Sequence, residues 1–428
     1  MKFSYRHKSK GILYVVLERL CHWQMYNQFR QIYLSDFDQI PLDKPMLIAA
    51  NHPTAFLDPV LIGVHADPPI YFMTRGDLFK KPRAKKILEL INMFPVNRQR
   101  DGFSGADRME QTNEYVFERL REQHPIGIFV EGQHHLDRRI IPLQKGVVRL
   151  AFGAYERFQQ PDLQVLPIGL SFRYGDQQRD TVSLVVGKPI FVKDYWQQYL
   201  ESPAKAAIQL LQDIRQQLIE LSHHVEKKGD DDLVEVLLRL HQGEQSVHYF
   251  PVIRRSNHLF YAEKSVVNQV NQMEEDAKKE LQKNVKKYFK TLNKYWVDDA
   301  ALLHPEWSSV PIWIFLILSF PFFLLGWLFR LPSATLAHFI SSKKVKKKEF
   351  KSSVFFGIEL LGSFFLYLFY LILALFTLKP LLIGLVILAP IVHPFSLMYR
   401  DAGTRAVAAL WARLHPQRAQ LLSERSKL

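Results

Sequence analysis

The pattern of hydrophobic and polar positions divides the chain into two parts of different character. Up to about residue 200, short apolar runs alternate with amphipathic stretches, whereas three long apolar stretches follow residue 300. Short runs typical of buried strands occur at 45–52, 70–73, 126–130, 164–170 and 182–186. Stretches with helical spacing lie between them at 57–66, 78–92, 106–122 and 145–158. This alternation predicts an α/β fold, in which a mixed sheet is flanked by helices.

The segments on either side of this α/β layer are predicted to be helical. Residues 11–34 place apolar and aromatic side chains at helical spacing, as in an amphipathic helix that packs on the core or lies on a bilayer surface. Residues 203–300 show no convincing strand pattern, and 264–296 are expected to form one long charged helix. We therefore divide the chain into an N-terminal helix (1–35), an α/β domain (36–200), a helical region (201–300) and a membrane-anchoring part (301–428).

Three apolar stretches in the last part are each long enough for a membrane span of ~20 residues. They cover 311–331, 354–376 and 380–399. The second and third are separated by only three residues, Thr377 to Lys379, and basic residues flank the pair at 343–348 and at Arg400 and Arg405. Because basic flanks stay on the cytoplasmic side, we expect a hairpin whose tight turn lies on the opposite side.

The first apolar stretch fits this topology only if it does not cross the membrane. Pro321 and Gly326 favour a bent, re-entrant or interfacial segment over 311–331. The alternative is three full spans, which would place the basic cluster and the N-terminal domain on opposite sides. Glu359 lies near the start of the second stretch, where it is near the interface, protonated, in contact with other protein groups or functional.

Composition and charge narrow the choice of partners. The net charge is +14 and the pI is about 9.5, which suits anionic lipid headgroups or phosphorylated substrates. We find no nucleic-acid-binding module and expect no nucleic-acid partner. Cys21 is the only cysteine, which excludes an intrachain disulfide and a cysteine zinc cluster. The apolar run near the N-terminus is short and ends at Glu18, which argues against a cleaved signal peptide.

Polar clusters follow several of the predicted strands. The stretch NHPTAFLDP (51–59) holds His52 and Asp58, and Glu131 and Gly132 follow a later strand. A His–Asp pair alone is more often part of a solvated loop. Because the carboxyl ends of parallel strands meet at one edge of a sheet, however, the separate clusters are expected to converge there.

Four stretches resemble, in order and rough spacing, the four blocks of the glycerolipid acyltransferase family (PlsC-type, including lysophosphatidate and glycerol-3-phosphate acyltransferases). They are NHPTAFLDP (51–59), NMFPVNRQRDG (92–102), GIFVEGQHHLDRR (127–139) and VLPIGLSF (165–172). The resemblance covers about residues 45–195. The chain departs from the family pattern in two places. His52 and Asp58 enclose one residue more than the usual first block, and Gln133 and His134 stand where Thr and Arg are expected.

The resemblance implies that His52 and Asp58 are the catalytic pair. An alcohol attacks a thioester poorly unless its proton leaves as the bond forms, and a neutral His52 accepts that proton. Asp58 is expected to bond the other ring nitrogen and fix its tautomer. No Ser or Cys nucleophile is needed, and no GxSxG elbow occurs in the chain.

The phosphate of the substrate requires fixed positive charge. Arg98 matches the arginine of the family's second block, and a guanidinium binds phosphate oxygens in bidentate fashion. Arg75 belongs to a basic run over 74–86 whose other interpretation is a solvated helix face. The full set of predicted substrate-binding residues is Arg98, Glu131, Gly132, Arg75, Arg138 and Arg139. His134 and His135 lack a further ligand at suitable spacing, so we expect no metal and no bound cofactor.

The sequence thus predicts an integral protein of the cell membrane whose active site faces the cytoplasm. We expect acyl transfer from acyl-CoA or acyl-carrier protein to glycerol 3-phosphate, lysophosphatidate or another lysophospholipid, in phospholipid biosynthesis. One alternative is a phospholipid-remodelling transacylase, which uses the same residues. The other is a catalytically silent lipid-binding membrane protein.

Overall fold

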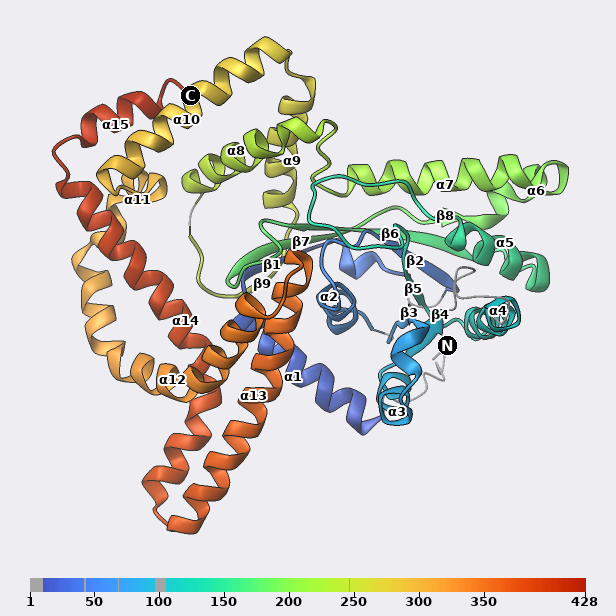
Figure 1. The fold of residues 1–428 in the computed structure, drawn as a ribbon, viewed down its shortest axis with the longest axis horizontal. Helices are drawn as coiled ribbons and strands as arrows, with labels where there is room; N and C mark the ends of the chain where they lie inside the picture. Colours follow the sequence, from blue (N-terminus) through green and yellow to red (C-terminus); the bar gives the residue numbers. More distant parts are fainter. Residues whose placement is uncertain (1–10, 42–43, 68, 97–104, 246) are drawn as a thin grey trace, which may run out of the picture.

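The computed structural model describes residues 11–41, 44–67, 69–96, 105–245 and 247–428, and its centre is one mixed sheet (Figure 1). The strands in this described part are β1 (Phe29–Ser35), β2 (Met46–Ala50), β3 (Tyr71–Arg75), β4 (Met93–Val96), β5 (Ile126–Phe129), β6 (Gln164–Phe172), β7 (Asp180–Val186), β8 (Ile190–Phe191) and β9 (Ile253–Arg255). Their order is β4-β3-β5-β2-β6-β7-β1-β9, with β8 beside β6. Pairing is parallel from β4 to β6, antiparallel between β6 and β7, and parallel again to β9.

Helices cover both faces of this sheet. Those of the α/β layer are α1 (Ile12–Gln28), α2 (Leu57–His65), α3 (Pro82–Leu90), α4 (Gly105–Arg121), α5 (Gly146–Phe158), α6 (Trp196–Glu201) and α7 (Pro203–Glu220). Alternate residues of β2 supply the two cores, as the pleat of a strand requires. Ile48 packs with α1 and α2 on one face, and Leu47 packs with α4, α5 and α7 on the other. The predicted α/β fold with a mixed sheet is confirmed.

A second group of helices lies beyond one edge of the sheet (Figure 1). It consists of α8 (Asp231–Glu244), α9 (His258–Gln272), α10 (Glu275–Tyr295), α11 (Asp299–Leu303) and α15 (Arg418–Arg425). The prediction of one helix over 264–296 is wrong, because the extended backbone of Glu274 separates α9 from α10. The prediction of no strand in 203–300 is also wrong. Strand β9 is too short to show a period and exists through its pairing with β1.

The N-terminal segment is a helix followed by a strand. The prediction of a helix over 11–34 is correct only up to Gln28, and β1 begins at Phe29. Most of β1 is buried between β7 and β9, so tertiary pairing overrides the local helical spacing there. The buried end of α1 packs on the same core as α2.

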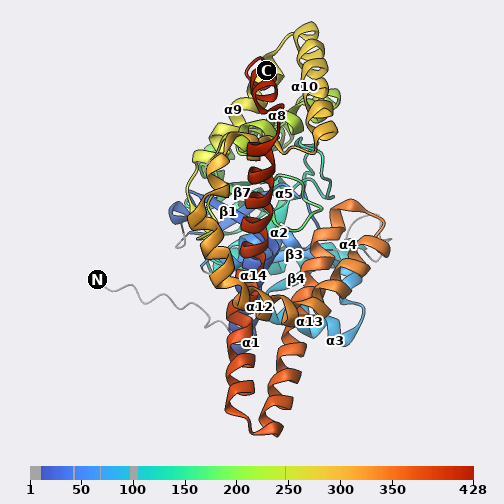
Figure 2. The ribbon, with the colours of Figure 1, turned by 90° about the vertical axis from the view of Figure 1, so that its left-hand side faces the viewer.

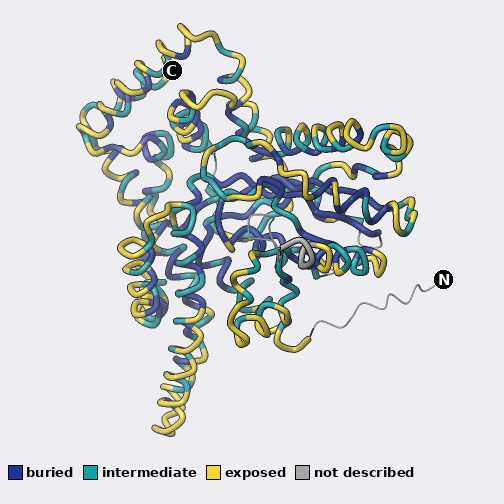
Figure 3. The backbone as a smooth tube through the Cα atoms, turned by 45° about the vertical axis from the view of Figure 1, so that its right-hand side comes forward, coloured by how far each residue is buried: buried dark blue, intermediate teal, exposed yellow. Residues whose placement is uncertain are grey.

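Three helices of the described part are long and apolar enough to cross a membrane, namely α12 (Val310–Lys343), α13 (Lys348–Thr377) and α14 (Pro380–Leu414). Helices α13 and α14 form a hairpin whose tip projects alone from the molecule (Figure 2). The tip is exposed (Figure 3), and its large apolar side chains include Phe369, Phe376 and Leu381. Helix α12 curves beside the base of the hairpin, and it contains Pro321 and Pro332.

Glu359 of α13 is fully buried and paired with protein groups. Its carboxylate lies 2.7 Å from Nη2 of Arg330 on α12, and it accepts a hydrogen bond of 2.8 Å from Nε2 of Gln24 on α1. The sequence left several explanations open for the charge of Glu359. The structure supports contact with other protein groups. The ion pair joins α12 to α13 and the hydrogen bond joins α1 to α13 at the base of the hairpin.

Candidate functional site

The His–Asp pair lies at the carboxyl end of β2, in the centre of the sheet. Strand β2 ends at Ala50, and the chain turns through 51–56 before α2 begins at Leu57. Asp58, in the first turn of α2, thereby comes back under the loop. Its Oδ2 lies 2.7 Å from Nδ1 of His52. The extra residue in the first block is accommodated within this turn.

Asp58 is fully buried and accepts three hydrogen bonds. Besides His52, the donors are the backbone nitrogen of Thr54 at 2.8 Å and its Oγ1 at 2.5 Å. Burial raises the pKa of the Asp58 carboxyl, and the hydrogen bonds from His52 and Thr54 oppose that shift. Three donors directed at one carboxyl group fit its ionised form. In that form Asp58 holds the proton of His52 on Nδ1.

The imidazole of His52 contacts two other rings. Phe129, at the end of β5, stacks on it with ring centroids 4.0 Å apart, and His134 meets it edge-on at 5.3 Å. Burial, and to a smaller extent His52, lower the pKa of His134, so His134 is neutral at pH 7. With Nδ1 bonded to Asp58, the basic nitrogen of His52 is Nε2. Within the described part of the chain, Nε2 has no hydrogen-bond partner.

Glu131 supports the loop that carries His52. It is almost fully buried after β5, and its Oε2 accepts the backbone N–H of His52 at 2.9 Å. Its Oε1 lies 3.1 Å from the nitrogen of Ile141 and 3.2 Å from Nε2 of His135. The hydrogen bond between Nε2 of His135 and Glu131 raises the pKa of His135. Glu131 therefore joins the first and third blocks through backbone and imidazole donors.

Gly132 turns the chain away from β5. Its φ of +68° lies in the left-handed region, and a Cβ atom there would lie 2.8 Å from Cγ of Gln144. Both observations require glycine at this position. The turn brings the segment from His134 to Arg139 across the ends of the central strands.

Comparison with known proteins shows which proteins the α/β part of the chain is similar to. The acyltransferase family matches residues 31–171. Glycerol-3-phosphate O-acyltransferase 2 of Saccharomyces cerevisiae is 27% identical over 143 residues, which are 33% of this chain and 19% of the yeast protein. The 1-acyl-sn-glycerol-3-phosphate acyltransferase of Bacillus subtilis is 24% identical over 191 residues, which are 44% of this chain and 87% of that protein.

The match over residues 31–171 and the similarity to both relatives support a glycerolipid acyltransferase domain in this part of the chain. The match is limited in extent, since the chain spans only 19% of the length of the yeast relative. A crystal structure of the 1-acyl-sn-glycerophosphate (LPA) acyltransferase PlsC from Thermotoga maritima aligns with a TM-score of 0.35. That alignment has 18% identity and covers 48% of this chain and 83% of the other.

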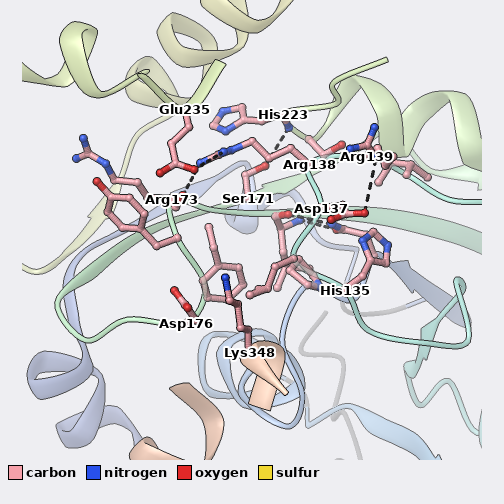
Figure 4. Close-up of a pocket in the computed structure, with 18 of the residues that line it drawn as sticks. His135, Asp137, Arg138, Arg139, Ser171, Arg173, Asp176, His223, Glu235 and Lys348 are labelled. Carbon is pink, nitrogen blue, oxygen red and sulfur yellow. Dashed lines mark hydrogen bonds and ion pairs between the residues drawn. The ribbon is translucent and has the colours of Figure 1, made fainter. Parts of the chain in front are cut away.

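A cavity of about 400 Å³ adjoins the loop that carries His52 (Figure 4). Asn51, Pro53 and Glu131 line it from the strand ends, and Lys348 points into it from α13. Its other charged walls come from Asp137, Arg138, Arg139, Arg173, Asp176 and Glu235. The lining is polar and carries charges of both signs, so the cavity suits a polar rather than an aliphatic group.

Arg138 and Arg139 both line this cavity and both have protein partners. Arg138 donates to the carbonyl oxygen of Arg173 and lies 3.7 Å from Glu235. Arg139 forms an ion pair with Asp231 at the start of α8. These contacts tie the third block of the acyltransferase domain to the helical region.

The other predicted phosphate ligands lie elsewhere. Arg75 is exposed at the end of β3, where its guanidinium bonds both carboxylate oxygens of Asp77 at 3.0 and 2.9 Å. Arg98 lies outside the described residues. Among the residues that are described, no group of three or more His, Cys, Asp or Glu side chains is arranged to hold a metal ion.

Sequence reasoning missed several residues that shape the site. The side chain of Asn51 exchanges two hydrogen bonds with the backbone of Leu170, at 2.9 and 2.7 Å, and so fastens the loop to β6. Thr54 bonds Asp58, and Phe129 stacks on His52. Asn51 and Thr54 stand inside the first block, so their nearness to His52 was the available signal. In the sequence, Phe129 resembles any other apolar strand residue and gives no sign of belonging to the site.

Proposed function

We propose that the chain transfers a fatty acyl group from a thioester, acyl-CoA or acyl-carrier protein, to a hydroxyl of glycerol 3-phosphate, lysophosphatidate or another lysophospholipid. The observation that carries the proposal is the 2.7 Å contact between Nδ1 of His52 and Oδ2 of Asp58 within an acyltransferase domain. The pair leaves a basic ring nitrogen available beside a buried carboxylate. This is the arrangement that a general base for an alcohol needs.

The proposed reaction is a direct transfer. Nε2 of His52 takes the proton of the acceptor hydroxyl while the hydroxyl oxygen bonds to the carbonyl carbon of the thioester. The carbon–sulfur bond then breaks, and the proton on His52 passes to the departing thiolate, which restores the neutral imidazole. Asp58 stabilises the imidazolium that exists between these steps. General-base assistance of this kind is worth roughly 10²–10⁴-fold in rate.

The polar part of a substrate is proposed to occupy the cavity beside the loop. Arg138 and Arg139 line it, and its volume of about 400 Å³ is in the range of small-molecule sites. Arg75, at the end of β3, and Arg98, which lies outside the described residues, remain predicted phosphate contacts. Glu131 and Gly132 are proposed to form the rim of the acceptor site, since Glu131 also lines the cavity.

The hairpin of α13 and α14 is proposed to anchor the domain in the cell membrane. Its tip is exposed and apolar, and the basic residues near its base include Lys343, Lys344 and Lys348. Basic residues near a membrane surface contribute about 1 kcal/mol each to binding anionic lipids. With those residues on the cytoplasmic side, the acyltransferase domain faces the cytoplasm, and the curved α12 stays at the interface.

The test is acyl transfer by the purified full chain in mild detergent. Radiolabelled palmitoyl-CoA is supplied with glycerol 3-phosphate, dihydroxyacetone phosphate, lysophosphatidate or lysophosphatidylcholine, and labelled products are separated. The proposal predicts transfer to at least one glycerol-based phosphate. A parallel reaction with labelled phosphatidylcholine as the only donor detects a transacylase. Transfer only from that phospholipid would replace the proposed donor, and no transfer from any donor, including acyl-carrier protein, would contradict the proposal.

A further inference from the structure

The first two turns of α13 contact the catalytic loop directly. The backbone carbonyl of Glu349 accepts the N–H of Ala55 at 3.2 Å, and Oγ of Ser353 accepts the N–H of Leu57 at 3.1 Å. Ser353 is fully buried at this contact. Two backbone donors of the loop between His52 and Asp58 are therefore satisfied by the first helix of the hairpin, almost 300 residues further along the chain.

The bond from Ser353 lies at the beginning of the helix that carries Asp58. The first N–H groups of a helix have no acceptor within it and need one from outside. Helix α2 has no side-chain hydrogen bond from its own capping residue, Phe56. Ser353 supplies an acceptor for Leu57, the residue next to Asp58. The position of the Asp58 carboxylate thus depends on a hydroxyl group from α13.

A second contact reaches His52 through two rings. Phe350 of α13 meets His134 edge-on, with ring centroids 4.5 Å apart and an interplanar angle of 88°. His134 meets His52 at 5.3 Å and 83°. Phe129 stacks on the imidazole of His52. Phe350 therefore supports the ring that closes one side of the proposed base.

The same end of α13 is part of the core of the acyltransferase domain. Phe356 and Leu360 pack with residues of α1, α2 and the sheet. Oγ of Ser352 donates to the carbonyl oxygen of Gly175 at 2.5 Å, beyond the end of β6. Towards its other end, α13 becomes an exposed apolar helix, with Phe365 and Phe376 among its exposed side chains. One rigid helix thus joins the apolar hairpin to the catalytic loop.

We propose that α13 is a positioning element of the active site, in which Ser353 fixes Asp58 and Phe350 fixes His52 through His134. The inference rests on the proposed function for its catalytic consequence. The structural link itself does not depend on which substrates are used. The packing of α13 on the domain then sets the geometry of the His–Asp pair. The hairpin of α13 and α14 therefore contributes to turnover as well as to membrane attachment.

The link is tested by amide hydrogen exchange of the full chain in detergent. We compare the peptide over 51–60 in the wild type, Ser353→Ala and the matched control Ser363→Ala. Ser363 lies on the same helix, is equally buried and bonds Oγ of Ser333 on α12 at 3.0 Å. Ser353→Ala should speed exchange in 51–60 by about fivefold or more, while Ser363→Ala should leave it unchanged. Equal exchange in all three proteins would overturn the proposal whatever their activity.

The catalytic consequence is tested by kcat and KM of the same proteins. Because misplacement of a catalytic group slows chemistry more than binding, Ser353→Ala should lower kcat about tenfold with KM within about twofold. Phe350→Ala should act likewise, and Phe350→Tyr, which keeps the ring, should restore most of kcat. A rise in KM at constant kcat, or equal loss in Phe350→Tyr and Phe350→Ala, would overturn the positioning role. Wild-type activity with unchanged kcat in Ser353→Ala would leave the proposed function standing and remove this inference alone.

Discussion

The carboxylate of Glu131 holds the backbone of His52, with Oε2 2.9 Å from the backbone nitrogen. The two residues follow neighbouring parallel strands, β5 and β2, so the sheet brings them to one edge. Hydrogen bonds to a buried carboxylate are strong because the charge has no competing water. Glu131 therefore acts on the proposed base through the backbone.

Replacing Glu131 by Gln should destabilise this loop. One carboxylate oxygen becomes an NH₂ group, which cannot accept the N–H groups of His52 or Ile141. An unpaired buried donor costs about 1–3 kcal/mol, and the free energy of unfolding should fall by that amount. Denaturation in mild detergent measures it. The control is Glu122→Gln, whose exposed carboxylate contacts Arg119 and His124, and for which we expect a change below about 1 kcal/mol. Equal stability of the two variants would contradict the buried role of Glu131.

Gly132→Ala should lower the free energy of unfolding, whereas Gly146→Ala should not. The left-handed φ of Gly132 and the 2.8 Å approach of Gln144 oppose a Cβ atom, whereas a Cβ on Gly146 meets nothing within 4 Å. Forcing alanine into the left-handed region costs about 1–2 kcal/mol. We expect a loss of that size in unfolding free energy for Gly132→Ala and no loss for Gly146→Ala, which lies in the first turn of α5. A stable Gly132→Ala would show that this turn relaxes without cost.

The bond between His135 and Glu131 should make stability depend on pH. The hydrogen bond raises the pKa of His135 above its usual 6.5. A raised pKa in the folded state stabilises the fold below the unfolded value, and this contribution is lost as pH rises through the folded value. The difference in unfolding free energy between wild type and His135→Gln should therefore shrink from pH 6 upwards. Melting temperatures across this range test it, and a difference that grows with pH would have the wrong sign.

Asp401 should be essential for seating α14 on the sheet. Its Oδ2 lies 2.8 Å from Nη2 of Arg179, and both side chains are buried, with 7% and 4% exposed. Removing one partner of a buried ion pair costs about 3–5 kcal/mol because the other charge is left unpaired. Asp401→Asn should lose about that much stability in detergent. The exposed pair of Lys44 and Asp162 provides the control, and Asp162→Asn should change stability by less than about 1 kcal/mol.

Strands β2, β6 and β7 could be predicted because nearly all of their residues are buried, whereas the short strands β4 and β8 were not predicted. Runs such as 164–170 are apolar throughout, and β6 is buried along its whole length. Strand β1 was not predicted because its apolar residues continue the helical spacing of α1. It forms a strand because it pairs with β7. Strand β9 is three residues long, too short for any period to be visible.

Some residues of the candidate site could also be predicted from nearby sequence, whereas others come from a helix far along the chain. His52 and Glu131 follow the ends of predicted strands, and Asp58 lies six residues after His52, so chain order was enough to bring them together. Ser353 and Phe350 could not be predicted, since nothing near them in sequence resembles a catalytic motif. Their contacts arise because the apolar helix α13 packs on Leu57 of α2 and on His134, which local patterns do not encode. Glu359 likewise required its partner Arg330 to be seen.

The most direct test of the central claim is the rate of acyl transfer by His52→Ala. The substitution removes the ring whose Nδ1 bonds Asp58 and whose Nε2 is the proposed base. With folding and membrane partition verified, the account predicts that kcat falls by about 10²–10⁴-fold for every acceptor that the wild type uses. A His52→Ala protein that keeps the wild-type kcat would contradict general-base catalysis by this pair.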